Sequence, residues 1–322
     1  MIGPETSQKL LKTAQDLYAH YKDCRLCPWK CGIDRSKGKS GPCRSPAYAS
    51  LAAYAVHHGE EPPISGTRGT GNLFFSGCSM SCVYCQNFEI SQETMGPKPT
   101  SPEDIGRAIH ALAQDNVHNI GLVSASHILP DAIMGLYHAA LKGVHLPVVY
   151  NTNSFENVET LKKLHGIVDI YLADLRYSND MDARKFSKTR NYVHQARQAI
   201  IEMARQVGPS LQIGPDNIAI KGLIVRMLVL PNDIAGIKSS LQFLKTTFGN
   251  SVTISIMAQY QPMYKASDYP FISRRLYYGE YLRALDLAES MGFKDIYVQS
   301  MDAAENYIPS FRNGTVSFSE RP

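Results

Sequence analysis

Seven cysteines constrain this chain more than any other feature, because all of them lie within the first 85 of its 322 residues. They form one cluster of four and one cluster of three: Cys24, Cys27, Cys31 and Cys43, then Cys78, Cys82 and Cys85. An odd number of cysteines cannot all pair as disulfides, and the N-terminal segment lacks the apolar core of a secretory signal. Two tight clusters in an intracellular chain therefore predict two metal sites.

The composition describes a globular protein with a large core. Apolar residues make up 44% of the chain and charged residues 19%, which excludes wholesale disorder. No apolar run is long enough to span a bilayer, so we expect a soluble, cytoplasmic protein without a membrane partner. The net charge of +4 is too small to indicate a nucleic-acid partner for the whole chain. Residues 61–322 contain 24 basic and 24 acidic residues, so the excess lies in residues 1–60.

Short β-rich runs alternate with helical patterns from residue 72 onward. Six runs are nearly continuous apolar stretches, as expected of parallel strands covered on both faces, and a seventh is weaker. They are residues 72–77, 120–124, 146–151, 168–175, 223–230 and 252–257, with 295–299 as the seventh. Helices are predicted over 1–22, after a Ser101 N-cap, along 192–207 and over 274–291. The alternation predicts a parallel α/β sheet, either open or curled toward a barrel, with its chemistry at the carboxyl ends of the strands.

The three-cysteine cluster directly follows the first predicted strand, with the spacing C-x3-C-x2-C. Three thiolates on one short loop can hold three corners of an iron–sulfur cube, and they leave the fourth iron without a protein ligand. Such an iron is an open coordination position at which a second molecule can bind, as in catalytic zinc sites. The alternative is a zinc site that takes its fourth ligand from His57, His58 or His127.

The residues around this loop resemble the radical S-adenosylmethionine (SAM) superfamily, and within it the pyruvate formate-lyase activating enzyme group. The likeness rests on blocks that follow one another in order within roughly residues 24–262: Phe74–Cys78, Tyr84–Asn87, Asn151–Phe155, Asp169–Arg176 and Arg226–Pro231. The Cys-x2-Cys-Pro that begins at Cys24, together with the segment His58–Gly66, resembles more narrowly that group's iron–sulfur branch, which has an N-terminal four-cysteine segment.

The resemblance implies the cofactors. It places a 4Fe–4S cluster on Cys78, Cys82 and Cys85, with SAM chelating the fourth iron. One electron from the reduced cluster would cleave SAM to methionine and a 5′-deoxyadenosyl radical, which abstracts hydrogen from the substrate. The resemblance also implies a protein or peptide substrate and a reductant such as flavodoxin or ferredoxin.

The resemblance further implies roles for residues around the cofactor. Tyr84 lies where an aromatic side chain approaches the adenine. Asp174 and Arg176 match a strand-end Asp-Leu-Lys whose basic residue faces the SAM carboxylate, a role that suits a guanidinium. Asn151 and Thr152 match an Asp-Thr that forms a cation site together with the aspartate of the next strand. Asn151 lacks the negative charge of that aspartate.

Arg226 matches an arginine near the substrate, so we group it with the three cysteines as catalytic. One segment departs from the family pattern. The activating enzymes carry Gly-Gly-Glu-Pro after strand two to bind the SAM amino group, whereas this chain reads Val-Ser-Ala-Ser-His over residues 123–127. Ser124, Ser126 and His127 offer hydroxyl and imidazole acceptors in its place.

The four-cysteine cluster has the spacing C-x2-C-x3-C-x11-C, and its thiolates can saturate either zinc or an auxiliary iron–sulfur cluster. Four thiolates around Zn²⁺ carry a charge of about −2, which nearby basic residues offset. These residues are Lys22, Arg25, Lys30, Arg35, Lys37, Lys39 and Arg44. We rank a structural metal site first, an electron-relaying cluster second, and a zinc ribbon that docks nucleic acid third.

Together these observations predict a radical SAM oxidoreductase, activase-like, that abstracts hydrogen from a protein or peptide. We expect an N-terminal helix and four-cysteine metal segment over 1–65, a partial (β/α)6-type parallel barrel over 66–300, and a C-terminal tail over 301–322. One alternative is radical modification of a small molecule or RNA. The other is a non-catalytic iron–sulfur electron carrier or metal-stabilised binding module, which would leave SAM intact.

Overall fold

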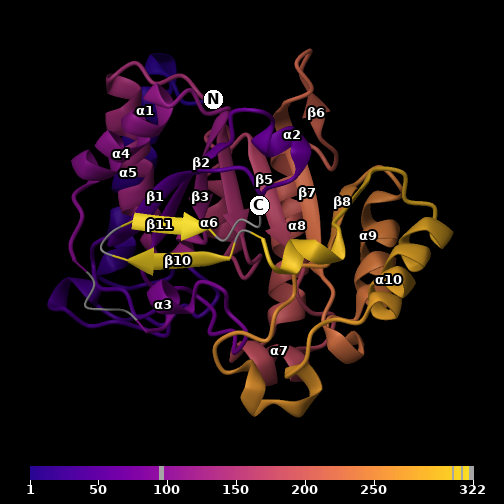
Figure 1. Ribbon diagram of the computed structural model, residues 1–322. Helices are drawn as coiled ribbons and strands as arrows, with labels where there is room; N and C mark the ends of the chain where they lie inside the picture. The colour runs from indigo at the N-terminus through magenta and orange to yellow at the C-terminus, as the bar shows by residue number, and fades with distance from the viewer. Residues whose placement is uncertain (94–97, 307, 313–314, 319–322) are drawn as a thin grey trace.

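The computed structural model describes residues 1–93, 98–306, 308–312 and 315–318. Its main element is one curved sheet with the hydrogen-bonded order β1-β2-β3-β4-β5-β7-β8-β9, and β6 pairs with β7 (Figure 1). The strands are β1 Leu51–His57, β2 Thr70–Phe75, β3 Asn119–Val123, β4 Val148–Thr152, β5 Ile170–Asp174, β6 Gln212–Ile213, β7 Ala219–Leu228, β8 Thr253–Met257 and β9 Ile296–Val298. All seven runs predicted from the sequence are strands of this sheet.

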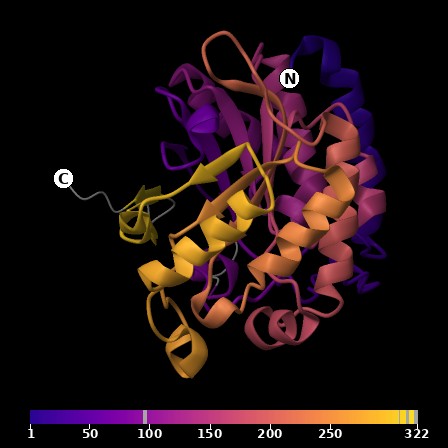
Figure 2. The same ribbon diagram turned by 90° about the vertical axis from the view of Figure 1, so that its right-hand side faces the viewer.

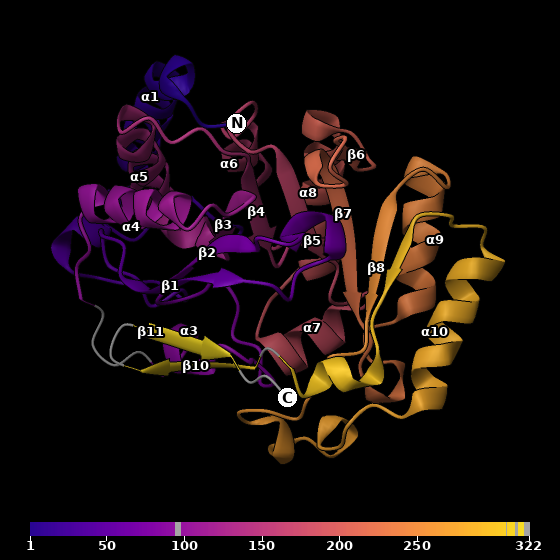
Figure 3. The same ribbon diagram turned by 45° about the horizontal axis from the view of Figure 1, so that its top comes forward.

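From β2 onward, the strands along this path are parallel and follow one another in chain order. Because crossovers between parallel strands are right-handed, this order places the connecting helices on one face of the sheet. Figure 3 shows the helices outside the curve of the sheet. No hydrogen-bonded pair joins β9 to β1 or β2 in the described part of the chain, so the sheet is a partial barrel, as predicted.

The longer helices pack on the convex face, with α1 outside α5. They are α1 Ser7–Tyr18, α4 Pro102–Gln114, α5 Leu129–Leu141, α8 Tyr192–Val207, α9 Ile237–Phe248 and α10 Tyr278–Ser290. Figure 2 shows α10, in yellow-orange, on the outer side of the sheet. The shorter helices are α2 Pro62–Ser65, α3 Phe88–Ser91, α6 Val158–Lys162 and α7 Asp180–Ser187. None of the described helices is long and apolar enough to cross a membrane.

Local side-chain contacts determine where the helices begin. The predicted N-cap is present, because Ser101 Oγ accepts a hydrogen bond from Asp104 N at 3.1 Å. The predicted helix over 274–291 begins later, at Tyr278. Glu280 Oε2 accepts from the backbone N of Tyr277 at 2.9 Å, and this capping contact sets the start of α10.

The first long helix and the last two described strands lie against the barrel. Leu10, Ala14 and Leu17 of α1 belong to the same buried cluster as the barrel core. β1 pairs antiparallel with β2 and extends the sheet beyond its parallel part. Near the C-terminus, β10 Pro309–Arg312 and β11 Thr315–Phe318 form an antiparallel pair beside β1 (Figure 1).

Candidate cofactor-binding site

The loop after β2 brings Cys78, Cys82 and Cys85 to the carboxyl end of the sheet. Gly77 begins this loop with a φ of 87°, and a Cβ atom there would lie 2.6 Å from the carbonyl oxygen of Cys43. Only glycine allows this close approach. The backbone N of Cys78 donates to the same carbonyl at 3.2 Å. The four-cysteine segment therefore supports the three-cysteine loop directly.

All three thiols of the loop are free, and they line one cavity of about 70 Å³. Burial raises the pKa of Cys78, and burial together with the neighbouring Cys82 raises the pKa of Cys85 to about 12. Thiols with such pKa values keep their protons at neutral pH unless a metal displaces them. Among the described residues, no three Cys, His, Asp or Glu side chains are grouped around the position of a single metal ion. The all-thiol donor set fits an iron–sulfur cluster.

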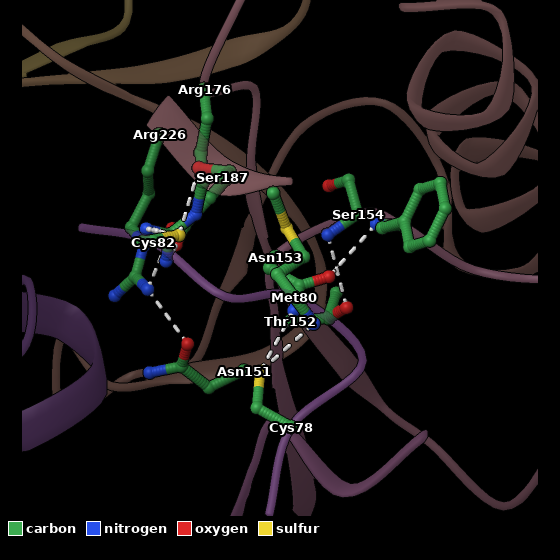
Figure 4. Close-up of polar contacts among 12 residues, drawn as sticks. Cys78, Met80, Cys82, Asn151, Thr152, Asn153, Ser154, Arg176, Ser187 and Arg226 are labelled. Carbon is green, nitrogen blue, oxygen red and sulfur yellow. Dashed lines mark hydrogen bonds and ion pairs between the residues drawn. The ribbon is translucent and has the colours of Figure 1, made fainter. Parts of the chain in front are cut away.

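Hydrogen-bond donors surround the sulfur atoms of this loop (Figure 4). Ser187 Oγ donates to Cys82 Sγ at 3.0 Å, and Arg176 Nη1 lies 3.8 Å from the same sulfur. Asn153 Nδ2 lies 3.6 Å from Cys78 Sγ. Such donors favour the thiolate over the thiol, and hydrogen bonds to the sulfurs of a cluster tune its reduction potential.

A second cavity, of about 190 Å³, adjoins the first at the carboxyl ends of the strands. The two cavities share Cys85, Ser124 and Arg176 in their walls. The predicted residues that line the larger cavity are Cys85, Tyr84, Ser124, Asn151, Asp174, Arg176 and Arg226. The structure therefore brings most of the residues predicted for cofactor binding to one place.

Asp174 lies between two guanidinium groups. Its Oδ2 accepts from Arg176 Nη2 at 2.6 Å, and its Oδ1 accepts from Arg226 Nε at 2.8 Å. Arg226 also donates to Asn151 Oδ1 at 2.7 Å and to Glu60 Oε2 at 2.9 Å. Burial opposes the charge of Arg226, but Asp174 and the neighbouring glutamates outweigh it and raise the pKa of Arg226. The guanidinium of Arg226 is therefore charged throughout the neutral pH range.

These contacts explain why residue 151 is an amide. Asp174 and Asn151 occupy the positions at which the resemblance implied a cation site. Both accept hydrogen bonds from the guanidinium of Arg226, and Asn151 Nδ2 donates to Glu60 Oε1 at 3.2 Å. An amide can accept from one neighbour and donate to another, whereas an ionised carboxylate can only accept. The positive charge between these residues belongs to Arg226.

Arg176 has a buried donor that no described residue satisfies. Its Nη2 binds Asp174 and its Nη1 faces Cys82, but its Nε is buried and has no hydrogen-bond partner among the described residues. A buried donor without a partner costs free energy, and a carboxylate that enters the cavity would satisfy it. The site therefore fits a ligand that carries a carboxylate group, as SAM does.

Tyr84 begins a buried chain of hydroxyl groups that ends at the cysteine loop. Its OH lies 2.6 Å from Tyr177 OH, which lies 2.7 Å from Ser187 Oγ. Ser187 in turn contacts Cys82 Sγ. Since a thiolate can only accept, a ligating Cys82 would orient all three hydroxyl groups toward the sulfur. The ring of Tyr84 also packs against Tyr260, with 5.7 Å between the ring centroids.

Three other predicted residues have different partners. Ser126 Oγ and Thr152 Oγ1 donate to Glu156 Oε1 at 2.5 and 2.6 Å. His127 Nε2 lies 2.8 Å from the carbonyl oxygen of Ser76. All three are buried, with their polar atoms bonded to other parts of the protein. Their role in cofactor binding stays a prediction.

His127 is expected to make the stability of the protein depend on pH. Burial, helped by the nearby charges of Arg35 and Arg44, lowers its pKa to about 4. In the unfolded chain the imidazole titrates near 6.5, so the unfolded state binds more protons between these values. The contribution of the neutral imidazole is complete above pH 6.5 and falls by roughly 3 kcal/mol as the pH drops to about 4. Urea unfolding should show a flatter dependence for His127→Gln over this window, and equal slopes would contradict the assignment.

Sequence reasoning missed Glu60, Tyr177 and Ser187 as parts of the site. Glu60 had a signal, because it lies in the segment His58–Gly66 that carried part of the resemblance. Tyr177 and Ser187 had none. Tyr177 lies in the loop between β5 and α7 and Ser187 ends α7, so their hydroxyl groups reach Cys82 only through tertiary packing.

The four-cysteine segment forms a second group of neighbouring thiols. Cys24, Cys27 and Cys43 are buried and Cys31 is half-buried, and all four are free. Burial raises the pKa of Cys27 and of Cys31, and the nearby Cys24 and Cys43 raise both further. Cys24 and Cys43 therefore lie near both Cys27 and Cys31.

A buried arginine lies beside these thiols. Arg35 is 1% exposed, and its Nη1 lies 3.9 Å from Cys24 Sγ and 2.6 Å from the carbonyl oxygen of His127. No carboxylate of the described residues lies within ion-pair distance of this guanidinium, which stacks 4.4 Å above the ring of Tyr21. Asp131 lies near enough to interact with the charge of Arg35, and thiolates around a metal would add further negative charge beside it. The four free thiols have the donor chemistry of a thiolate-held metal, but in this structure the described residues do not group them around one ion position.

Comparison with known proteins defines the class to which this fold and site belong. The family model described as the radical SAM superfamily matches residues 72–244, more than half of the chain. The chain belongs to the radical SAM superfamily, and this membership implies a 4Fe–4S cluster and SAM as cofactors. The matched residues contain the three-cysteine loop and run from β2 into α9.

The chain is also similar to individual proteins, at low sequence identity. An uncharacterized protein of Methanocaldococcus jannaschii is 30% identical over 287 residues, which cover 86% of this chain and 77% of that protein. A solved radical SAM methyltransferase from Sphaerobacter thermophilus aligns with a TM-score of 0.49 at 13% identity, over 71% of this chain and 66% of that chain. HydG, a maturase of the [FeFe]-hydrogenase, aligns with a TM-score of 0.47 at 13% identity. The alignment covers 69% of this chain and 48% of that chain.

Proposed function

We propose that this protein is a radical SAM enzyme of the activase-like kind that cleaves SAM reductively and abstracts hydrogen from a protein or peptide. The observation that carries the proposal is the pair of adjoining cavities, one lined by three free thiols and the other by Asp174 and Arg226, with Arg176 in both walls. When bound, the cluster and SAM supply one-electron cleavage and a hydrogen-abstracting radical.

The residues of the chain hold and orient the cofactors. Cys78, Cys82 and Cys85 would bind the cluster through thiolates, which Ser187 and Arg176 stabilise from the surrounding wall. The free Nε of Arg176 is the donor that would receive the carboxylate of SAM. Asp174 fixes the orientation of this guanidinium through its contact with Nη2. A preoriented donor loses little conformational freedom when the ligand binds.

The lining of the larger cavity supports a peptide as the substrate. Eight of its side chains are amides: Asn72, Gln86, Asn87, Asn151, Gln259, Gln261, Gln299 and Asn306. Each amide side chain can both donate and accept a hydrogen bond, which matches the alternating N–H and C=O groups of a peptide backbone. Gln259 and Gln299 already form such a pair, with Gln299 Nε2 donating to Gln259 Oε1 at 3.0 Å.

The reaction is tested first with SAM alone. The protein is reconstituted anaerobically with iron and sulfide, reduced with dithionite and incubated with SAM, and the products are separated by chromatography. The proposal predicts equimolar methionine and 5′-deoxyadenosine. Intact SAM beside a fully loaded, reducible cluster would favour an electron carrier instead.

The class of substrate is tested by isotope transfer. A proteome labelled with deuterium at carbon is dialysed to separate its proteins from its small molecules, and each fraction is added to the reduced enzyme with SAM. Deuterium should appear in 5′-deoxyadenosine with the protein fraction. Transfer only from the dialysed small molecules would favour small-molecule modification.

The four-cysteine segment holds, in this proposal, a structural metal that is independent of the cysteine loop after β2. A variant in which Cys78, Cys82 and Cys85 are all replaced by Ala is expected to retain about one zinc per chain, because four thiolates saturate zinc. Elemental analysis after anaerobic purification measures this. Two or more iron atoms per chain would assign an auxiliary cluster instead, and a folded variant without metal would contradict a metal site.

A further inference from the structure

Residues 180–190 and 264–278 form one continuous surface, here called the basic face. Lys185 Nζ lies 5.1 Å from the ring centroid of Phe271, and Lys188 Nζ donates to Tyr269 OH at 3.1 Å. Figures 1 and 3 show α7 beside the segment that follows β8, at the lower end of the molecule in both views. Side chains from two distant parts of the sequence therefore build a single surface.

The basic face concentrates positive charge that the rest of the barrel lacks. Its two segments contain seven cationic and three acidic side chains, although residues 61–322 as a whole are balanced. Arg274 and Arg275 pair with Glu280 and Glu305. The other five cations are exposed and form no ion pair with any residue that the structure describes: Arg184, Lys185, Lys188, Arg190 and Lys265. Unpaired surface cations attract an anionic partner over about a Debye length.

Exposed aromatic side chains belong to the same segments, and Lys185 lies over Phe271 while Arg274 lies over Tyr277. Phe271 is 58% exposed, Tyr277 62% and Tyr278 63%. Exposed aromatic residues mixed with basic ones are typical of surfaces that bind a partner, because aromatic rings and arginine are enriched at protein interfaces. The basic face therefore has the composition of an interface.

The basic face lies directly over the cysteine loop. The backbone N of Val83 donates to the carbonyl of Phe186 at 2.8 Å, which joins the loop to the end of α7. Ser187 Oγ contacts Cys82 Sγ at 3.0 Å, and the next residue, Lys188, is exposed. Ser187 therefore lies between the exposed Lys188 and the sulfur of Cys82, which would hold the cluster. Electron transfer is fastest when the path from the protein surface to the cluster is this short.

We propose that the basic face docks an acidic one-electron carrier protein of the flavodoxin or ferredoxin class. In this step the carrier loses one electron and the cluster gains it, with no proton or heavy atom transferred. The inference rests on the proposed function, because reductive cleavage of SAM consumes one electron from outside the chain. A nucleic acid would also bind a basic surface with aromatic residues, but the contact between Ser187 and Cys82 favours an electron carrier.

Charge reversal on the basic face tests the proposal. The variant Lys185→Glu/Lys188→Glu is compared with Lys9→Glu/Lys12→Glu, which makes the same charge change at exposed positions of α1. Reduction of the reconstituted full-length protein by photoreduced flavodoxin is followed by stopped flow at low and high ionic strength. The first variant should be reduced at least tenfold more slowly at low ionic strength, with the difference lost in high salt. The α1 variant should match the wild type.

Two further arms separate the possible causes. Dithionite should reduce both variants at the wild-type rate, because it needs no docking surface, and Lys185→Gln/Lys188→Gln should give an intermediate rate with flavodoxin. Equal rates of reduction by flavodoxin in all variants would overturn the proposal. The proposal would also be overturned if Lys185→Glu/Lys188→Glu lost binding to single-stranded RNA while flavodoxin still reduced it at the wild-type rate. If dithionite reduces the wild type but no 5′-deoxyadenosine forms, the proposed function fails, while the flavodoxin rates still decide the docking site.

Discussion

Replacement of Cys82 by Ser is expected to lower the formation of 5′-deoxyadenosine by at least about a thousandfold, because the cleavage has no other route. A serine hydroxyl keeps its proton at neutral pH and is a poor ligand for iron, whereas a cysteine thiolate is a good one. Cys82 is buried beside Ser187 and Arg176, and neither a neutral hydroxyl nor a guanidinium can replace a thiolate as a ligand for iron. The measurement is chromatography of the products after reduction by dithionite, with iron counted in the same sample.

A neighbouring position of the same loop provides the control. Ser81 Oγ accepts a hydrogen bond from Arg44 Nη1 at 3.0 Å and contacts none of the three thiols in the described contacts. Ser81→Ala should therefore keep its cluster and lose less than about tenfold in product, as expected when one neutral partner is removed. Wild-type product formation by Cys82→Ser would contradict the assignment of the cluster.

The second large effect is expected at Asp174. Asp174→Asn should lower the free energy of unfolding by about 3–5 kcal/mol, because it leaves the guanidinium groups of Arg226 and Arg176 without this carboxylate. The side chain of Asp174 is 9% exposed and that of Arg226 10%, so solvent compensates little of the lost interaction. Urea unfolding of the reconstituted protein, followed by circular dichroism under anaerobic conditions, measures the change.

An exposed ion pair of similar length is the control for Asp174. Lys162 Nζ lies 2.7 Å from Glu159 Oε1, and the Glu159 side chain is 72% exposed. Glu159→Gln should lower the free energy of unfolding by less than about 1 kcal/mol. Equal costs at Asp174 and Glu159 would show that the charge network of the cavity does not stabilise the fold.

The sequence predicts the barrel well because its parallel strands are buried on both faces. Strands such as β2 and β8 are buried at every residue, so their apolar runs are continuous. β1 was missed because it is only partly buried, and Tyr54 in its middle is 44% exposed. A strand of this kind has no continuous apolar run that separates it from a loop.

The site was predictable where it depends on spacing, and not where it depends on packing. The spacing of Cys78, Cys82 and Cys85 placed these thiols after β2, and the structure brings them to one cavity. Side chains alternate along a strand, so Asn151 lines the larger cavity while its neighbour Thr152 points to Glu156. Matching of motifs alone does not resolve this alternation.

Ser126 and His127 show the same limit in a turn. They belong to the short helical turn Ala125–Ile128 that follows β3, and all four of its residues are buried. Ser124, at the start of this turn, has a φ of 52° and lines both cavities. The direction in which each side chain points depends on this backbone conformation, which the order of residue types does not specify.

The central claim is that three thiolates hold a 4Fe–4S cluster whose fourth iron is left for SAM. The Mössbauer spectrum of the protein reconstituted with iron-57, recorded before and after addition of SAM, tests it most directly. For the cluster of the loop after β2, the account predicts that one iron in four changes its signal when SAM is added. A spectrum that SAM leaves unchanged would contradict the claim.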